Sequence, residues 1–254
     1  MIQEKVIKKY VRLMDSAVMK EYYGQSGFLN VGYWNSNTHT QAQASEQLVQ
    51  EIINPIDFIP QNILDVACGM GATTNYIHKQ FPLANITGIN VSPHQVKICE
   101  ERWSNLSFKV MDAAQLIFDN ESFDAVISVE AAVHFDSRKK FFEEAFRVLK
   151  KNGQLVISDL TFSKKLNWIT AESNNEANSE DFYKLLKEIG YTNIQIKEVL
   201  EETWIPYYKN MLKWGMTKNF KNELSNEDYQ EIIMAGKITQ KLPITHYLLI
   251  SAKK

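Results

Sequence analysis

The chain has 254 residues, enough for one large α/β domain carrying a modest cap. Its formal net charge of −2 argues against a nucleic-acid partner, because binding a phosphate backbone rewards a basic surface. No apolar run approaches the roughly 20 residues that span a bilayer, and two cysteines make no disulfide framework, so we expect a cytoplasmic protein without a membrane partner.

Apolar residues at helical spacing predict an amphipathic helix within residues 1–23. A stretch rich in Gly, Asn and aromatic residues follows and is typical of a loop. A second helix is expected over 41–53, and Pro55 and Pro60 end it. We interpret residues 1–53 as an N-terminal helical cap or lid on the core.

From Asn62 onward, short apolar runs alternate with helical stretches. Strands are predicted at 62–66, 86–90, 107–110, 124–129 and 154–159. Helices are predicted near 72–81, 93–102 and 137–150. This alternation predicts an α/β fold with a doubly wound, mostly parallel sheet.

The remaining sequence is less regular. Segment 161–178 is polar and predicts an insertion or flap; a helix over 179–189 and a strand over 192–199 follow. Residues 203–238 are expected to be helical, and HYLLISA is the last strand of seven. We interpret 161–178 and 203–238 as substrate-cap insertions in a single domain, 1–254. An apolar acceptor pocket is one interpretation of Trp204, Tyr207, Tyr208, Trp214 and Met216.

The segment ILDVACGMGATT, residues 63–74, joins a buried strand to a helix through a tight turn. Gly69 and Gly71 can adopt positive φ and let a ligand approach the backbone. Asp65 lies four positions before the first glycine, where a carboxylate repels a pyrophosphate and suits a cationic amino acid group. The turn also lacks the third glycine of GxGxxG, which leaves an NAD(P)-dependent oxidoreductase as a distant alternative.

This acidic residue before a GxG turn resembles the first motif of the class I S-adenosylmethionine-dependent methyltransferases. The resemblance implies a Rossmann-like methyltransferase fold. It also implies S-adenosylmethionine as cofactor and S-adenosylhomocysteine as product.

Two later motifs extend the resemblance. Asn90 ends the second strand, where the family usually carries an acidic residue for the ribose, and VSPHQV is similar to sterol- or tocopherol-type and small-molecule members. Asp112 is placed at the adenine amino group, with Met111 and Ala113 beside the ring. The cofactor-binding residues implied are Tyr23, Tyr33, Asp65, Ala67, Gly69, Gly71, Asn90, Val91, Gln95, Met111, Asp112, Ala113 and Glu130.

The stretch EAAVHF, from Glu130, resembles the members that methylate sugar and polyketide hydroxyls. The resemblance implies that His134 is a catalytic base, and Asp159 could orient it or contact substrate. Neutral imidazole suits removal of a hydroxyl proton near pH 7. The predicted function is methyl transfer to a hydroxyl of a small, natural-product-like molecule.

Several alternatives stay open. The same cofactor site could serve N- or C-methylation, and a binding module with a vestigial pocket is a further reading. No cluster of carboxylates has metal-ligand spacing, so no metal is expected. The sequence leaves a homodimer open.

Overall fold

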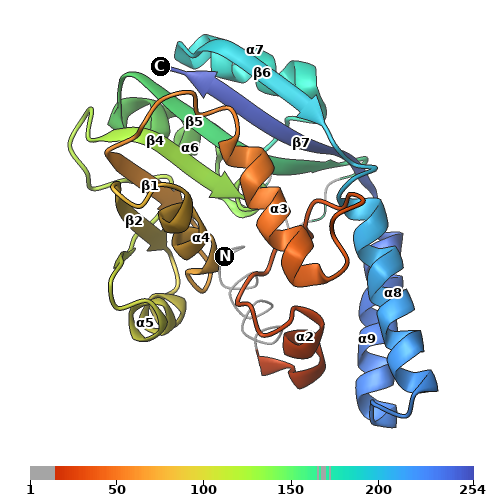
Figure 1. Cartoon of the computed structure of the whole chain (residues 1–254). Coiled ribbons are helices and arrows are strands. Elements are labelled where there is room, and N and C mark those ends of the chain that lie inside the picture. Colours follow the sequence, from red (N-terminus) through yellow and green to blue (C-terminus); the bar gives the residue numbers. More distant parts are fainter. Residues whose placement is uncertain (1–14, 165, 167–169, 172) are drawn as a thin grey trace.

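The computed structural model describes residues 15–164, 166, 170–171 and 173–254 (Figure 1). Of the helix predicted within 1–23, the described part is α2 (Ala17–Tyr22), and residues 1–14 lie outside the described residues. Helix α3 (Gln41–Ile53) starts at a capping box in which Thr40 and Gln43 satisfy each other's backbone N–H groups. The prediction of a helix over 41–53 is confirmed.

A seven-stranded sheet forms the centre of the molecule, in the order β3-β2-β1-β4-β5-β7-β6. Its strands are β1 (Asn62–Val66), β2 (Asn85–Asn90), β3 (Ser107–Val110), β4 (Phe123–Val129), β5 (Leu149–Phe162), β6 (Thr192–Glu198) and β7 (Ile244–Lys253). The first five strands pair in parallel, whereas β7 lies antiparallel between β5 and β6. The predicted fold class is confirmed, although β5 is longer at both ends than predicted.

Helices cover both faces of this sheet (Figure 1). They are α4 (Ala72–Gln80), α5 (Pro93–Arg102), α6 (Arg138–Val148) and α7 (Ser179–Ile189). Ile63 packs in one core with α3 and α4, and its neighbour Leu64 packs in the other with α6 and α7. This alternation along buried strands places a hydrophobic core on each side.

The helical region predicted at 203–238 is a hairpin of two helices, α8 (Trp204–Phe220) and α9 (Asn226–Lys241). Ser225 caps α9 by accepting a hydrogen bond from the backbone N–H of Asp228. The helices approach closely at Gly236, where an added Cβ would lie 2.7 Å from Leu212 Cδ2. Figure 1 shows the hairpin reaching away from the sheet on the side of α2.

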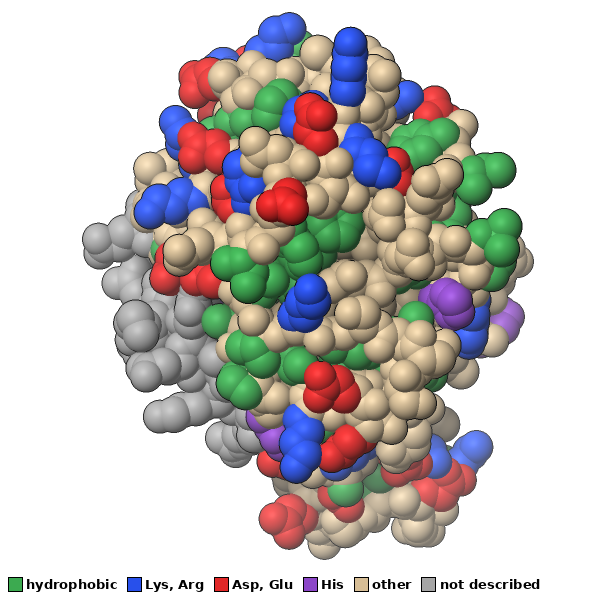
Figure 2. Space-filling model, turned by 90° about the vertical axis from the view of Figure 1, so that its left-hand side faces the viewer, with side chains coloured by type: hydrophobic (Ala, Val, Ile, Leu, Met, Phe, Trp, Pro, Cys, Tyr) green, Lys and Arg blue, Asp and Glu red, His purple; other side chains and the backbone are tan. Residues whose placement is uncertain are grey.

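The surface matches the balanced composition. On the face drawn in Figure 2, basic and acidic side chains are interspersed, and hydrophobic side chains form small groups between them. In the part of the chain that the structure describes, no helix combines the length and the apolarity needed to cross a membrane. Among those same residues, no group of three or more His, Cys, Asp and Glu side chains could hold a metal ion.

Candidate functional site

An open cavity lies at the carboxyl ends of β1, β2 and β4, where the order of the parallel strands reverses. Ligands bind at this point in open α/β sheets because the connecting loops diverge there. The predicted residues on its wall are Asp65, Ala67, Gly69, Asn90, Val91, Gln95, Met111, Asp112, Ala113, Glu130 and His134.

The two glycines of the turn between β1 and α4 have different surroundings. Both have positive φ, 56° at Gly69 and 79° at Gly71. A Cβ on Gly69 would meet only Leu29 Cδ1, at 3.9 Å, whereas one on Gly71 would lie 2.5 Å from Trp103 Cδ1. Gly69 therefore borders the cavity, while Gly71 packs behind the turn and does not line it. The expected role of Gly71 as a ligand contact stays a prediction.

The two positions predict different defects on substitution by alanine. Gly71→Ala should lose about 1–3 kcal/mol more stability than Gly69→Ala, because its Cβ collides with the Trp103 ring. Gly69→Ala should fold but bind S-adenosylhomocysteine at least about tenfold more weakly, because its Cβ enters the cavity. Thermal unfolding and calorimetric titration of both variants test this, and equal loss of affinity without a stability difference would contradict it.

Asp65 supplies a buried carboxylate on the cavity wall. Asp65 is 1% exposed, and its Oδ2 accepts a 2.6 Å hydrogen bond from Thr74 Oγ1. Burial raises the pKa of Asp65 to about 7, partly offset by that bond. A cationic ligand beside Asp65 would stabilise its ionised form.

Asn30 offers a second acceptor oxygen for such a ligand, and the sequence-based prediction missed it. It lines the same cavity from the loop before α3, and its buried Oδ1 has no hydrogen-bond partner among the described residues. Buried acceptors without partners are rare in folded proteins. Asn30 and Asp65 together fit the amino group of a methionine-like ligand.

Asn90 and Asp112 are held by local hydrogen bonds. Asn90 Oδ1 accepts from the backbone N–H of Ser92 at 2.9 Å, which fixes the start of α5. Asp112 Oδ1 accepts from the backbone N–H of Ala114 at 2.9 Å. Both residues therefore present oriented polar groups to the cavity, beside the apolar side chains of Met111 and Ala113.

The loop after β4 brings Glu130 and His134 to the cavity. Glu130 Oε1 accepts from the backbone N–H of Val31 at 2.9 Å and from Tyr247 Oη at 2.6 Å. Burial raises the pKa of Glu130 to about 7 despite these two donors. His134 ends a 3-10 turn, η1 (Ala132–His134), and faces the cavity beside Phe135.

Like Gly71, three other predicted site residues lie away from the cavity wall. Tyr23 Oη contacts Tyr207 Oη at 2.8 Å in a buried aromatic cluster, and Tyr33 packs under Lys197 Nζ. Asp159 is buried in an ion pair with Arg138, Oδ2 to Nε 2.7 Å. None of the three lines the cavity, and their roles at the cofactor or the substrate stay predictions.

The loop before α3 lines the cavity more extensively than predicted. Its composition had indicated only a loop, and the approach of that loop to β1 depends on contacts distant in sequence. The lining residues that were not predicted are Gly27, Phe28, Leu29, Asn30, Val66, Cys68, Met70, Thr73, Ile89, Val129, Ala131 and Phe135. The expected apolar acceptor residues of α8 are absent from this wall.

Residues 64–157 match the model of the family described as "Methyltransferase domain". The erythromycin 3''-O-methyltransferase of Saccharopolyspora erythraea is 26% identical over 91% of this chain and 84% of its own length. An O-methyltransferase of Pyrenophora dematioidea is 36% identical over 53% of this chain, and the match spans about half (54%) of its length.

Solved structures share the fold. The crystal structure of the cyclase SpnF has a TM-score of 0.73 at 18% identity and covers 97% of this chain and 94% of its own. Phosphoethanolamine N-methyltransferase 2 of Haemonchus contortus, in complex with S-adenosyl-L-methionine, has a TM-score of 0.72 at 17% identity and covers 96% and 60%. Similarity at these identities shows the fold alone.

Proposed function

Since this chain belongs to the class I S-adenosylmethionine-dependent methyltransferases, we propose that it methylates a hydroxyl of a small, natural-product-like acceptor. The observation that carries the proposal is the position of His134, which shares one cavity wall with Asp65 and Asp112. A base and a cofactor site in the same cavity are what methylation of a hydroxyl requires. The names of the two relatives, both O-methyltransferases, support an oxygen atom as the acceptor.

Each group on the wall has a proposed task. The bound cofactor supplies a methyl group activated by its sulfonium. Asp65 and Asn30 hold the cationic amino group, and Asp112 accepts from the adenine amino group. Asn90 hydrogen-bonds a ribose hydroxyl. His134 takes the proton of the acceptor hydroxyl, and alignment of the reactants in the cavity supplies much of the remaining rate.

Methylation of nitrogen or carbon with the same cofactor site is the competing function. An amine attacks as its free base, so such an enzyme would depend little on His134. Solved neighbours of this chain include N- and C-methyltransferases, at identities that show the fold only.

The test uses S-adenosylmethionine carrying a trideuterated methyl group and two matched sets of acceptors. One set contains macrolide glycosides and polyketide phenols with unmodified hydroxyls, and the other contains the corresponding amines. Mass spectrometry should find a trideuteriomethyl ether on a member of the first set. Label found only on nitrogen or carbon would overturn the hydroxyl acceptor. Absence of binding to S-adenosylhomocysteine in calorimetry would overturn the assignment of the cofactor residues.

A further inference from the structure

The loop that carries His134 is attached at both ends to three successive residues of β5. At its start, the backbone N–H of Glu130 donates to the carbonyl oxygen of Ser158 at 3.1 Å. At its end, Arg138 Nε donates to Asp159 Oδ2 at 2.7 Å, and Nη2 donates to the carbonyl oxygen of Leu160 at 2.8 Å. The loop is therefore held against the carboxyl end of a central strand.

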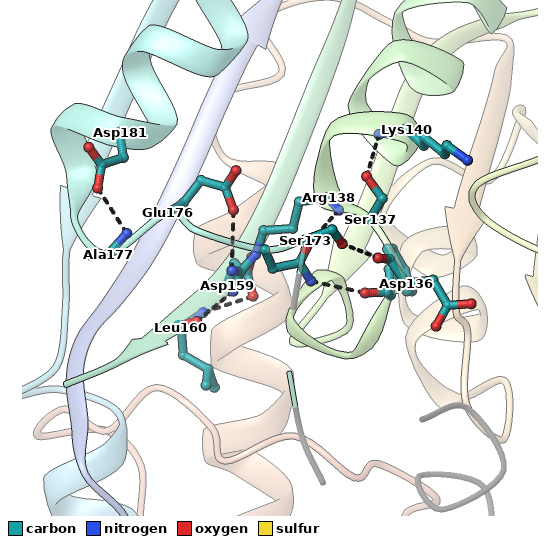
Figure 3. A network of polar contacts seen from close by, with 12 residues as sticks. Asp136, Ser137, Arg138, Lys140, Asp159, Leu160, Ser173, Glu176, Ala177 and Asp181 are labelled. Carbon is teal, nitrogen blue, oxygen red and sulfur yellow. Dashed lines mark hydrogen bonds and ion pairs between the residues drawn. The ribbon is translucent and has the colours of Figure 1, made fainter. Parts of the chain in front are cut away.

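A turn from a distant segment holds the middle of this loop (Figure 3). Asn174 Nδ2 donates to the carbonyl oxygen of Phe135 at 2.9 Å, and Asn174 Oδ1 accepts from the backbone N–H of Arg138 at 2.8 Å. Ser173 Oγ donates to the carbonyl oxygen of Asp136. One side chain therefore connects the residue after His134 to the first residue of α6.

The surrounding charges favour this arrangement. Asn174 is 4% exposed, and the Arg138 guanidinium beside it is buried over the Phe182 ring at 5.2 Å. Arg138 Nη1 also lies 3.5 Å from Glu176 Oε2, two residues after Asn174. Arg138 therefore connects β5 to the segment after Asn174 through two carboxylates, and losing the arginine would leave the buried Asp159 without its counter-charge.

We propose that Asn174 is a positioning residue that sets where His134 stands in the cavity. The inference rests on the proposed function of His134 as the base. None of the described residues between 163 and 178 lines the cavity, so we expect Ser173 and Asn174 to act on the reaction through the loop that carries His134. Displacement of a reacting group by about 1 Å can cost about 100-fold in rate, so two lost hydrogen bonds next to His134 suffice for a large effect.

The first measurement needs no acceptor. The chain has five histidines, whose ring Cε1–H signals can be assigned by single substitutions in an NMR spectrum. Asn174→Ala should shift or broaden the His134 signal and change its titration curve. Asn178→Ala is the matched control, because Asn178 caps α7 in the same segment without contacting the loop. A His134 signal that is identical in wild type and Asn174→Ala would overturn the proposal.

A second variant guards against simple unfolding. Asn174→Asp keeps the acceptor for the Arg138 N–H but removes the donor to Phe135, with nearly the same shape. It should also move the His134 signal, with affinity for S-adenosylhomocysteine held within about threefold of wild type. If Asn178→Ala disturbs His134 as much as both Asn174 variants do, the effect is general destabilisation and the proposal fails.

Kinetics with an acceptor that the enzyme is found to methylate distinguish this inference from the proposed function on which it rests. Asn174→Ala should lower kcat at least about tenfold with KM for S-adenosylmethionine nearly unchanged. In a His134→Ala background the same substitution should cost little more, because both act through one group. Additive losses would overturn the positioning role. Normal turnover in His134→Ala alone would instead overturn the proposed base.

Discussion

Asp65→Asn should abolish measurable binding of S-adenosylhomocysteine and yet stabilise the empty protein at pH 8. The amide oxygen can still accept the hydrogen bond from Thr74, but the negative charge that attracts the ligand's amino group is gone. The same charge is a cost before the ligand arrives, because it is buried. Calorimetric titration and thermal unfolding measure the two effects on one sample.

The pH dependence follows from the pKa of Asp65, which burial raises from its ordinary value of 3.8 to about 7. Between these values the folded protein holds a proton that the unfolded chain releases. Stability from this group is therefore complete below pH 4 and is lost as the pH rises through 7. The stability advantage of Asp65→Asn over wild type should therefore grow as the pH rises from 5 to 8. The whole pKa difference corresponds to about 4 kcal/mol, at about 1.4 kcal/mol per pKa unit, and part of it is already reached at pH 5.

Ligand binding by the wild type should show the opposite pH dependence. A cationic ligand requires ionised Asp65, so affinity should fall as the pH drops below 7. Asp124→Asn is a matched control away from the cavity, since donors including Lys150 lower the pKa of Asp124. It should leave affinity unchanged and lose stability at neutral pH. Equal affinity of wild type and Asp65→Asn would remove Asp65 from the site.

His134→Ala should lower kcat by about 100- to 10,000-fold, the range that general base catalysis contributes. Affinity for S-adenosylhomocysteine should stay within about threefold, because the imidazole is assigned to the acceptor and not to the cofactor. The control is His246→Ala, whose ring contacts Glu198 at 2.7 Å outside the cavity and whose loss should leave kcat near normal. Turnover of His134→Ala close to wild type would contradict the base and favour nitrogen or carbon as the acceptor atom.

The elements with strong local patterns were predictable from the sequence. The run at 62–66 matches β1 at both ends, because a buried strand followed by a turn and a helix leaves a short apolar block. The run at 107–110 also matches β3 at both ends, although only Phe108 of that strand is buried. The glycine turn likewise placed Asp65 and Gly69 at the cavity, since strand, turn and helix are contiguous there. Local sequence was sufficient for these positions.

Contacts between residues distant in sequence determine the positions of other site residues. Asp159 ends a predicted strand in the way a substrate contact would, but Arg138 lies 21 positions away and neutralises it. Asn30 lies at the cavity in a loop whose Val31 backbone N–H donates to Glu130 Oε1, 99 positions away. Neither Asp159 nor Asn30 has a local sequence pattern that indicates its surroundings in the fold.

The antiparallel strand β7 links the cavity to the far half of the sheet. Tyr247 crosses from that strand to Glu130 on the cavity wall, and its own strand pairs with neighbours on both sides. Local unfolding of β7 would therefore disturb Glu130 on the cavity wall. In return, a nucleoside bound in the cavity would stabilise β7 against local unfolding. Backbone amides from Ile244 to Lys253 should accordingly exchange with deuterated solvent more slowly once the nucleoside is bound, although none of these residues lines the cavity.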